Sequence, residues 1–148
     1  MRVHHCEYAH DMNQRAHQKL IVWQEAYQLT LEIYRMTRTF PSEEKYALVS
    51  QMRRAAYSIP FNIAEGNEKR SKKERLHFFE IAKASLEELH CQCQLSKDLS
   101  YLSNAQFARL DTAIQHVSYL LIQIRKSLKN SLPSSSHSSH SSHSSHSS

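Results

Sequence analysis

The residues best suited to chemistry in this sequence are basic and form two groups. The larger group falls within seven residues and comprises Lys69, Arg70, Lys72, Lys73 and Arg75. The smaller group is the pair Arg53 and Arg54. Clustered Lys and Arg side chains can neutralise the phosphates of a nucleic acid, and such binding weakens steeply as salt is added. Both groups are therefore candidate nucleic-acid-binding residues.

Each basic group also has a simpler interpretation. Glu65, Glu68 and Glu74 lie close to the larger group and could pair with it on a solvated face. Arg53 and Arg54 could make salt bridges within their helix or to another subunit. The whole chain has 19 Lys and Arg residues against 14 Asp and Glu residues, a net charge of +5. This surplus favours an anionic partner such as RNA or DNA, although it could also serve only solubility.

The other chemistry-bearing residues lack the spacing of an active site or a metal centre. The chain has a single glycine, so it has no phosphate-binding loop. Glu87 and His90 have the Glu-x-x-His spacing of di-iron bundles, but the last helical segment offers no matching partner. Cys91 and Cys93 are too close in sequence for a structural zinc pair. We expect no catalytic residues, no metal site, no cofactor and no enzymatic activity.

The two ends of the chain differ in composition from the middle. Residues 1–17 are polar and show no periodicity, so we expect a flexible arm, within which Met12 is an alternative start to Met1. Residues 131–148 are almost entirely Ser and His and cannot form a core, so we expect a disordered tail. Its four regularly spaced histidines could bind Zn or Ni, but only weakly. The folded domain should therefore span residues 18–130.

Residues 18–130 carry four amphipathic helical patterns, in which apolar residues recur at three- and four-residue steps. The first spans residues 19–39, the second spans residues 42–66, the third begins at Ser71 and the fourth begins at Ser103. Ser42 should cap the start of the second helix, and Gly66 should cap its end. Ser71 and Ser103 each begin a capping-box sequence. Long helices with short connections predict an all-α, up-down-up-down four-helix bundle.

The same periodicity predicts which side chains form the core. The predicted stripe of the first helix is Trp23, Ala26, Tyr27, Thr30, Ile33, Tyr34 and Thr37. In the third helix it includes Ala82, Leu86, Leu89, Cys93 and Ser96, with Phe78 or Phe79 before them. In the fourth helix it includes Phe107, Leu110, Ile114, Val117, Leu121, Ile124 and Leu128.

Pro60 lies inside the second helical pattern. A proline there lacks the amide that would bond to the carbonyl of Ala56 and clashes with that carbonyl, so we expect a kinked helix. The apolar stripe keeps its phase across Pro60, which favours one kinked helix over two short ones. Ser58 and Asn62 lie two residues to either side of Pro60 and could bond to the backbone groups that a kink frees.

The segment around Pro60 also carries a family resemblance. Residues 51–66 match the pattern Gln, one variable residue, Arg-Arg-Ala, then Ser-Ile-Pro, then Asn-Ile-Ala-Glu-Gly. Val22-Trp23-Gln24 and the run from Ser85 to Leu89 provide supporting matches. Over residues 20–130 the chain resembles the four-helix bundle proteins of the 23S rRNA intervening-sequence family. Relatives of this family include the accessory variability-determinant proteins of diversity-generating retroelements. The structural signature that the resemblance implies is Ser58, Pro60, Asn62, Glu65 and Gly66.

The resemblance implies a ring-like homopentamer with a basic central channel. It thereby implies a non-enzymatic, ribosome-associated RNA-binding protein encoded by a 23S rRNA intervening sequence. In the retroelement relatives the basic surface binds nucleic acid and a reverse transcriptase. The alternative function is therefore an interaction scaffold or accessory subunit that docks a reverse transcriptase. We expect the signature mainly to fix helix shape and subunit packing, with Asn62 and Glu65 facing Arg53 or Arg54 of an adjacent subunit.

The cysteines and the distribution of apolar residues bear on the cellular compartment of the protein. The three cysteines, Cys6, Cys91 and Cys93, are an odd number, and we interpret them as reduced thiols. No run of 18 apolar residues exists, and the first residues contain no apolar block typical of a signal peptide. These features predict a cytoplasmic protein without a membrane partner.

Overall fold

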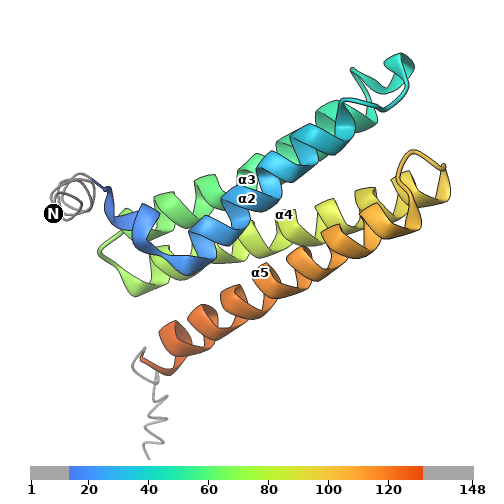
Figure 1. Ribbon diagram of the computed structural model, residues 1–148. Coiled ribbons are helices and arrows are strands. Elements are labelled where there is room, and N and C mark those ends of the chain that lie inside the picture. Colours follow the sequence, from blue (N-terminus) through green and yellow to red (C-terminus); the bar gives the residue numbers. More distant parts are fainter. Residues whose placement is uncertain (1–13, 132–148) are drawn as a thin grey trace, which may run out of the picture.

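The computed structural model describes residues 14–131, which form four long antiparallel α-helices (Figure 1). These are α2 (Ile21–Thr37), α3 (Leu48–Glu68), α4 (Lys72–Asp98) and α5 (Asn104–Asn130). Helix α3 packs against α2 and α4, and α5 packs against α4 and α2, so the four helices enclose one core. The described segment contains no strand. The all-α, up-down-up-down four-helix bundle is confirmed.

The core follows the predicted stripes closely in α4 and α5 and less closely in α2. Every predicted position of α4 from Ala82 to Ser96 is buried, with Phe79 ahead of them in the core. In α2 the buried face is rotated relative to the prediction. Tyr27 and Tyr34 are 40% and 36% exposed, and Leu29 and Met36 are buried in addition to Ala26 and Ile33. The reason is that a tyrosine at a stripe position can pack its ring along the surface. Tyr27, for example, stacks on Trp23 with 4.9 Å between ring centroids.

The start of the second helix differs from the prediction. Helix α3 begins at Leu48, whereas Ser42–Glu44 forms a separate 3-10 helix, η2, directly after Pro41. The Ser42 side chain does not cap the second helix. Instead, Oε2 of Glu44 accepts a hydrogen bond from the amide of Leu48, the first residue of α3, at 3.2 Å. The other carboxylate oxygen of Glu44 accepts a bond from the Tyr101 hydroxyl at 3.1 Å. Glu44 thus joins the α2–α3 connection to the α4–α5 connection.

Gly66 does not cap the second helix, contrary to the prediction. It lies inside α3, which continues to Glu68, and its φ is not positive. A Cβ at this position would lie 2.9 Å from Cβ of Phe78 and 3.2 Å from Cε1 of Phe79. Gly66 is needed because the backbone of α3 approaches the first turns of α4 too closely for any side chain.

The ends of the bundle also refine the predicted boundaries. A 3-10 helix, η1 (Ala16–Lys19), contacts α2 and α3, so Ala16 and His17, which were expected in the arm, are part of the packed structure. The rest of that arm (with Cys6 and Met12) and the Ser/His tail beyond residue 131 lie outside the described residues. The capping box at Ser103 has both of its bonds to Gln106. At Ser71 the structure has only the bond from the Glu74 amide, at 3.4 Å.

Candidate nucleic-acid interface

The helix that carries the signature is continuous through Pro60, as predicted. The carbonyl of Ala56, which lacks its usual helical partner because Pro60 has no amide, accepts a bond from Oγ1 of Thr30 at 2.9 Å. Thr30 lies on α2 and is buried, and its hydroxyl is also 2.9 Å from the carbonyl of Ala26. The backbone group freed by Pro60 is therefore satisfied by a neighbouring helix. The bend expected at Pro60 stays a prediction.

Neither Ser58 nor Asn62 bonds to the carbonyl of Ala56, although Asn62 does bond to a backbone carbonyl close to Pro60. Asn62 Nδ2 donates to the carbonyl of Ser58 at 2.7 Å and to its Oγ at 3.0 Å. The Ser58 hydroxyl lies 2.9 Å from the hydroxyl of Ser85 on α4. These three side chains therefore form one polar network across α3 and α4. The sequence singled out Ser58 and Asn62 but gave no signal for Ser85 as their partner.

The two arginines of the smaller basic group lie in different surroundings. Arg53 Nε donates to Thr37 Oγ1 at 3.0 Å, and its guanidinium lies 4.7 Å from the ring centroid of Tyr34. Arg53 thus attaches α3 to α2, a role the sequence did not predict, and no carboxylate among residues 14–131 forms an ion pair with it. Arg54 is exposed and faces the other way, along the boundary between α3 and α4. The signature residue Glu65 pairs instead with Lys69, at 3.7 Å.

The larger basic group surrounds the turn between α3 and α4. Lys69 lies 5.2 Å from the ring centroid of Phe78, in addition to its ion pair with Glu65. Lys72 Nζ donates to the carbonyl of Ser131, at 3.2 Å. Arg70 and Lys73 are exposed, and no carboxylate of residues 14–131 lies within ion-pair distance of either. Two members of the group are therefore free to contact an external anion.

Folding brings further basic residues to the same place. The bond from Lys72 to Ser131 places the end of α5 beside the start of α4, and η1 lies against the last turns of α3. We call this region the basic end. Its basic residues are Arg15, Lys19, Lys69, Arg70, Lys72, Lys73, Arg75, Arg125, Lys126 and Lys129. Its acidic residues are Glu65, Glu68, Glu74 and Glu80.

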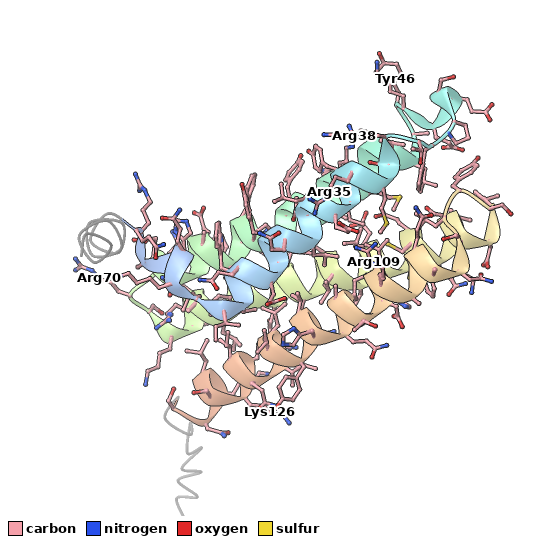
Figure 2. The ribbon with its side chains drawn as sticks, viewed as in Figure 1. Arg35, Arg38, Tyr46, Arg70, Arg109 and Lys126 are labelled. Carbon is pink, nitrogen blue, oxygen red and sulfur yellow. The ribbon has the colours of Figure 1, made fainter. Side chains whose placement is uncertain are left out.

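The net charge of the chain resides in this region. The basic end has ten of the 19 Lys and Arg residues and four of the 14 acidic residues, a net charge of +6. The other described residues have eight basic and eight acidic side chains and are therefore neutral in sum, and Arg2, Glu7 and Asp11 lie outside the described residues. Figure 2 shows Arg70 and Lys126 in this region, far from Arg38 and Tyr46 at the opposite end of the bundle. The sequence revealed only the part of this region between residues 69 and 75.

Comparison with known proteins identifies the family. The model of the 23S rRNA-intervening sequence protein family matches residues 18–123, which is most of the chain. The chain belongs to this family. The resemblance inferred from residues 51–66 is thereby confirmed, and both basic groups lie inside the matched region of this 23S rRNA-intervening sequence family protein.

A solved structure gives the same fold. It is the crystal structure of a protein with unknown function from the S23 ribosomal protein family of Bacteroides thetaiotaomicron. The TM-score is 0.67 at 21% sequence identity, and the similar region covers 72% of this chain and 99% of that chain. At this identity the comparison establishes the fold alone. A search among curated proteins found no match.

The described part also contains cysteines and side chains of the kinds that bind metal ions. Within residues 14–131 no three His, Cys, Asp or Glu side chains are placed to hold a metal ion, and no helix is long and apolar enough to cross a membrane. Burial raises the pKa of the Cys93 thiol to about 12, with a smaller contribution from the carboxylate of Asp111. Since thiolates are the nucleophilic form, Cys93 is unreactive at neutral pH. Cys91 is exposed.

Proposed function

We propose that this member of the 23S rRNA-intervening sequence family is a non-enzymatic, cytoplasmic RNA-binding protein that works as a homopentamer. The observation that supports RNA binding is the concentration of charge at the basic end, which carries +6 while the other described residues are neutral in sum. A localised positive region with exposed, unpaired Lys and Arg is the usual electrostatic feature of a phosphate-binding surface.

The placement of the basic residues in α4 supports this proposal independently. Lys72, Lys73 and Arg75 lie in the first turn of α4, where the helix dipole is positive. Cations at this position destabilise a helix, whereas anions stabilise it, so these three residues are unfavourable for folding. The same dipole and the exposed amides of the first turn would add to the attraction of Lys and Arg for a phosphate. Helix stability therefore does not account for these three basic residues, whereas a phosphate-binding role does.

The homopentamer is proposed from the family resemblance. Several large apolar side chains are exposed in the single chain, among them Ile21, Leu31 and Tyr119. Exposed apolar side chains of this size are typical of contacts with other subunits when they gather on one surface. Native mass spectrometry of the full chain measures the number of subunits directly, and a monomer would contradict this part of the proposal.

Fluorescence anisotropy with a labelled 23S rRNA fragment tests RNA binding. We expect affinity to fall steeply with salt. The double variant Arg70→Ser/Lys73→Ser should reduce the log–log salt slope by about 0.7 for each phosphate of single-stranded RNA that it no longer neutralises. The matched control is Arg38→Ser/Lys45→Ser, which removes two exposed basic residues at the opposite end and should leave the slope unchanged. A wild-type affinity that does not respond to salt would refute the proposed function.

The connection between α2 and α3 favours a second candidate function. Tyr46 is 86% exposed at the tip of the α2–α3 hairpin, and exposed aromatic residues are common anchors at protein interfaces. An accessory subunit that docks a reverse transcriptase could use such an anchor. Co-purification with a co-encoded reverse transcriptase, lost in Tyr46→Ala and retained in Arg70→Ser/Lys73→Ser, would favour this candidate over RNA binding.

A further inference from the structure

A groove between α3 and α4 lies outside the basic end. Its volume is about 420 Å³, which is within the usual range for small-ligand sites. The residues that matter along its walls are Arg54, Tyr57, Phe61, Asn62, Ser85 and Glu88. We call it the α3–α4 groove. It contains the Ser58–Asn62–Ser85 network described above.

One wall of the groove is aromatic and open to solvent. Phe61 is 62% exposed, although phenylalanine is among the residues most often buried. Its ring centroid lies 5.2 Å from that of Tyr57, with the two planes tilted by 34°. Tyr57 therefore supports Phe61 from one side.

The floor of the groove is polar and has unused hydrogen-bonding capacity. Asn62 uses both amide hydrogens on Ser58, and its Oδ1 has no partner among residues 14–131. The Ser58–Ser85 bond uses one hydroxyl hydrogen of the two, so one hydroxyl hydrogen remains free to donate. A groove lined by a free acceptor, a free donor and an exposed aromatic ring offers partners for both the edge and the face of a nucleobase. An apolar helix of another subunit would leave both groups unsatisfied.

The charges around the groove indicate which part of a nucleotide it would hold. Arg54 and Glu88 both line it, so it has no net charge to attract a phosphate. The nearest basic residue of the basic end that follows Phe61 in the sequence is Lys69, eight residues later and directly after the last residue of α3. At a rise of about 1.5 Å per residue this separation is about 12 Å, short enough for one single-stranded segment to reach both regions.

We propose that the α3–α4 groove receives one unstacked base of single-stranded RNA, with the Phe61 ring as its stacking surface. Asn62 Oδ1 and a hydroxyl of Ser58 or Ser85 bond to the edge of the base, and the neighbouring phosphates lie on the basic end. This inference rests on the RNA binding proposed above and specifies the form of RNA that is recognised.

The test measures the affinity of the full chain for an unstructured oligoribonucleotide and for the same sequence in a duplex. Phe61→Ala should weaken single-strand binding by roughly 5- to 150-fold, the range for loss of one aromatic–base stack. The salt slope should not change, because the variant neutralises the same phosphates. Duplex affinity should also be unchanged, since paired bases cannot enter the groove. Phe61→Tyr should retain binding, and Tyr46→Ala, which removes an exposed ring at the opposite end of the bundle, is the matched control.

The outcomes separate this inference from the proposed function. Salt-dependent binding by the wild type with an unaltered single-strand affinity in Phe61→Ala would overturn the inference alone. An equal loss of single-strand and duplex affinity in Phe61→Ala would also overturn it. A change of subunit number in Phe61→Ala without a change in RNA affinity would assign the groove to contacts between copies. Absence of RNA binding by the wild type would overturn both.

Discussion

The hydrogen bond between Thr30 and Ala56 allows a quantitative test of how α3 accommodates Pro60. The Ala56 carbonyl is buried and accepts from Thr30 Oγ1 at 2.9 Å. The substitution Thr30→Val keeps the side-chain shape and removes this donor. Because a buried acceptor without a partner costs about 1–3 kcal/mol, we expect the free energy of unfolding to fall by that amount.

The double-mutant cycle with Pro60→Ala isolates the bond. Alanine at position 60 has an amide that can donate to the Ala56 carbonyl, so Thr30→Val should then cost less than about 1 kcal/mol. The expected coupling between the two substitutions is about 1–2 kcal/mol, measured by urea unfolding of all four proteins. Thr112→Val is the control, because the Thr112 hydroxyl donates only within its own helix, to Ala108 at 3.0 Å, and is exposed.

Additive effects would refute this reasoning. If Thr30→Val costs the same with proline or alanine at position 60, within about 0.5 kcal/mol, then the hydroxyl does not serve the carbonyl that Pro60 frees. In that case the hydroxyl hydrogen would be donated to Ala26, the other carbonyl at 2.9 Å.

Three further outcomes follow from the packing and electrostatics. Gly66→Ala should lower the free energy of unfolding, since overpacking against Phe78 costs about 1–3 kcal/mol and outweighs a helix-propensity gain of about 1 kcal/mol; a higher urea midpoint would contradict this. Lys73→Glu should stabilise the chain by about 0.3–1 kcal/mol at low salt through the helix dipole while weakening RNA binding, and parallel losses of stability and binding would argue against it. In the unfolded chain the Cys93 thiol should ionise near the ordinary cysteine pKa of 9.0, whereas in the folded chain its pKa is about 12. The unfolded state therefore binds fewer protons above pH 9, and the free energy of unfolding should decline there by up to about 1.4 kcal/mol per pH unit. This decline should be reduced in Cys93→Ala, and an unchanged urea-unfolding pH profile in that variant would contradict the assignment.

Local sequence patterns predicted the helices well because their information is local. The three- and four-residue spacing of apolar side chains in α5 and the capping box at Ser103 each depend on residues a few positions apart. The contact between Thr30 and Ala56 joins positions 26 residues apart, and no periodicity encodes it. Gly66 was assigned to a cap because a cap and a close helix contact both require the absence of a side chain. Only the position of Phe78 distinguishes the two.

The candidate site was predictable in part for the same reason. Five basic residues between positions 69 and 75 are adjacent in sequence and were found directly. The end of α5 and the helix η1 join them only through the antiparallel topology. The α3–α4 groove was not predicted, since Ser85 becomes the partner of Ser58 only when two helices pack in one particular register.

The uneven charge of the bundle constrains how copies of it can assemble. A net positive charge at one end of an elongated subunit, whose other described residues are neutral in sum, gives the subunit an electric dipole along the helices. Rotational symmetry cancels the components of such dipoles that are perpendicular to the symmetry axis and adds the components that are parallel to it. A ring whose axis follows the helices would therefore be strongly polar, with every basic end on one face. A ring whose axis crosses the helices would be nearly nonpolar, and a polyanion would then approach its rim.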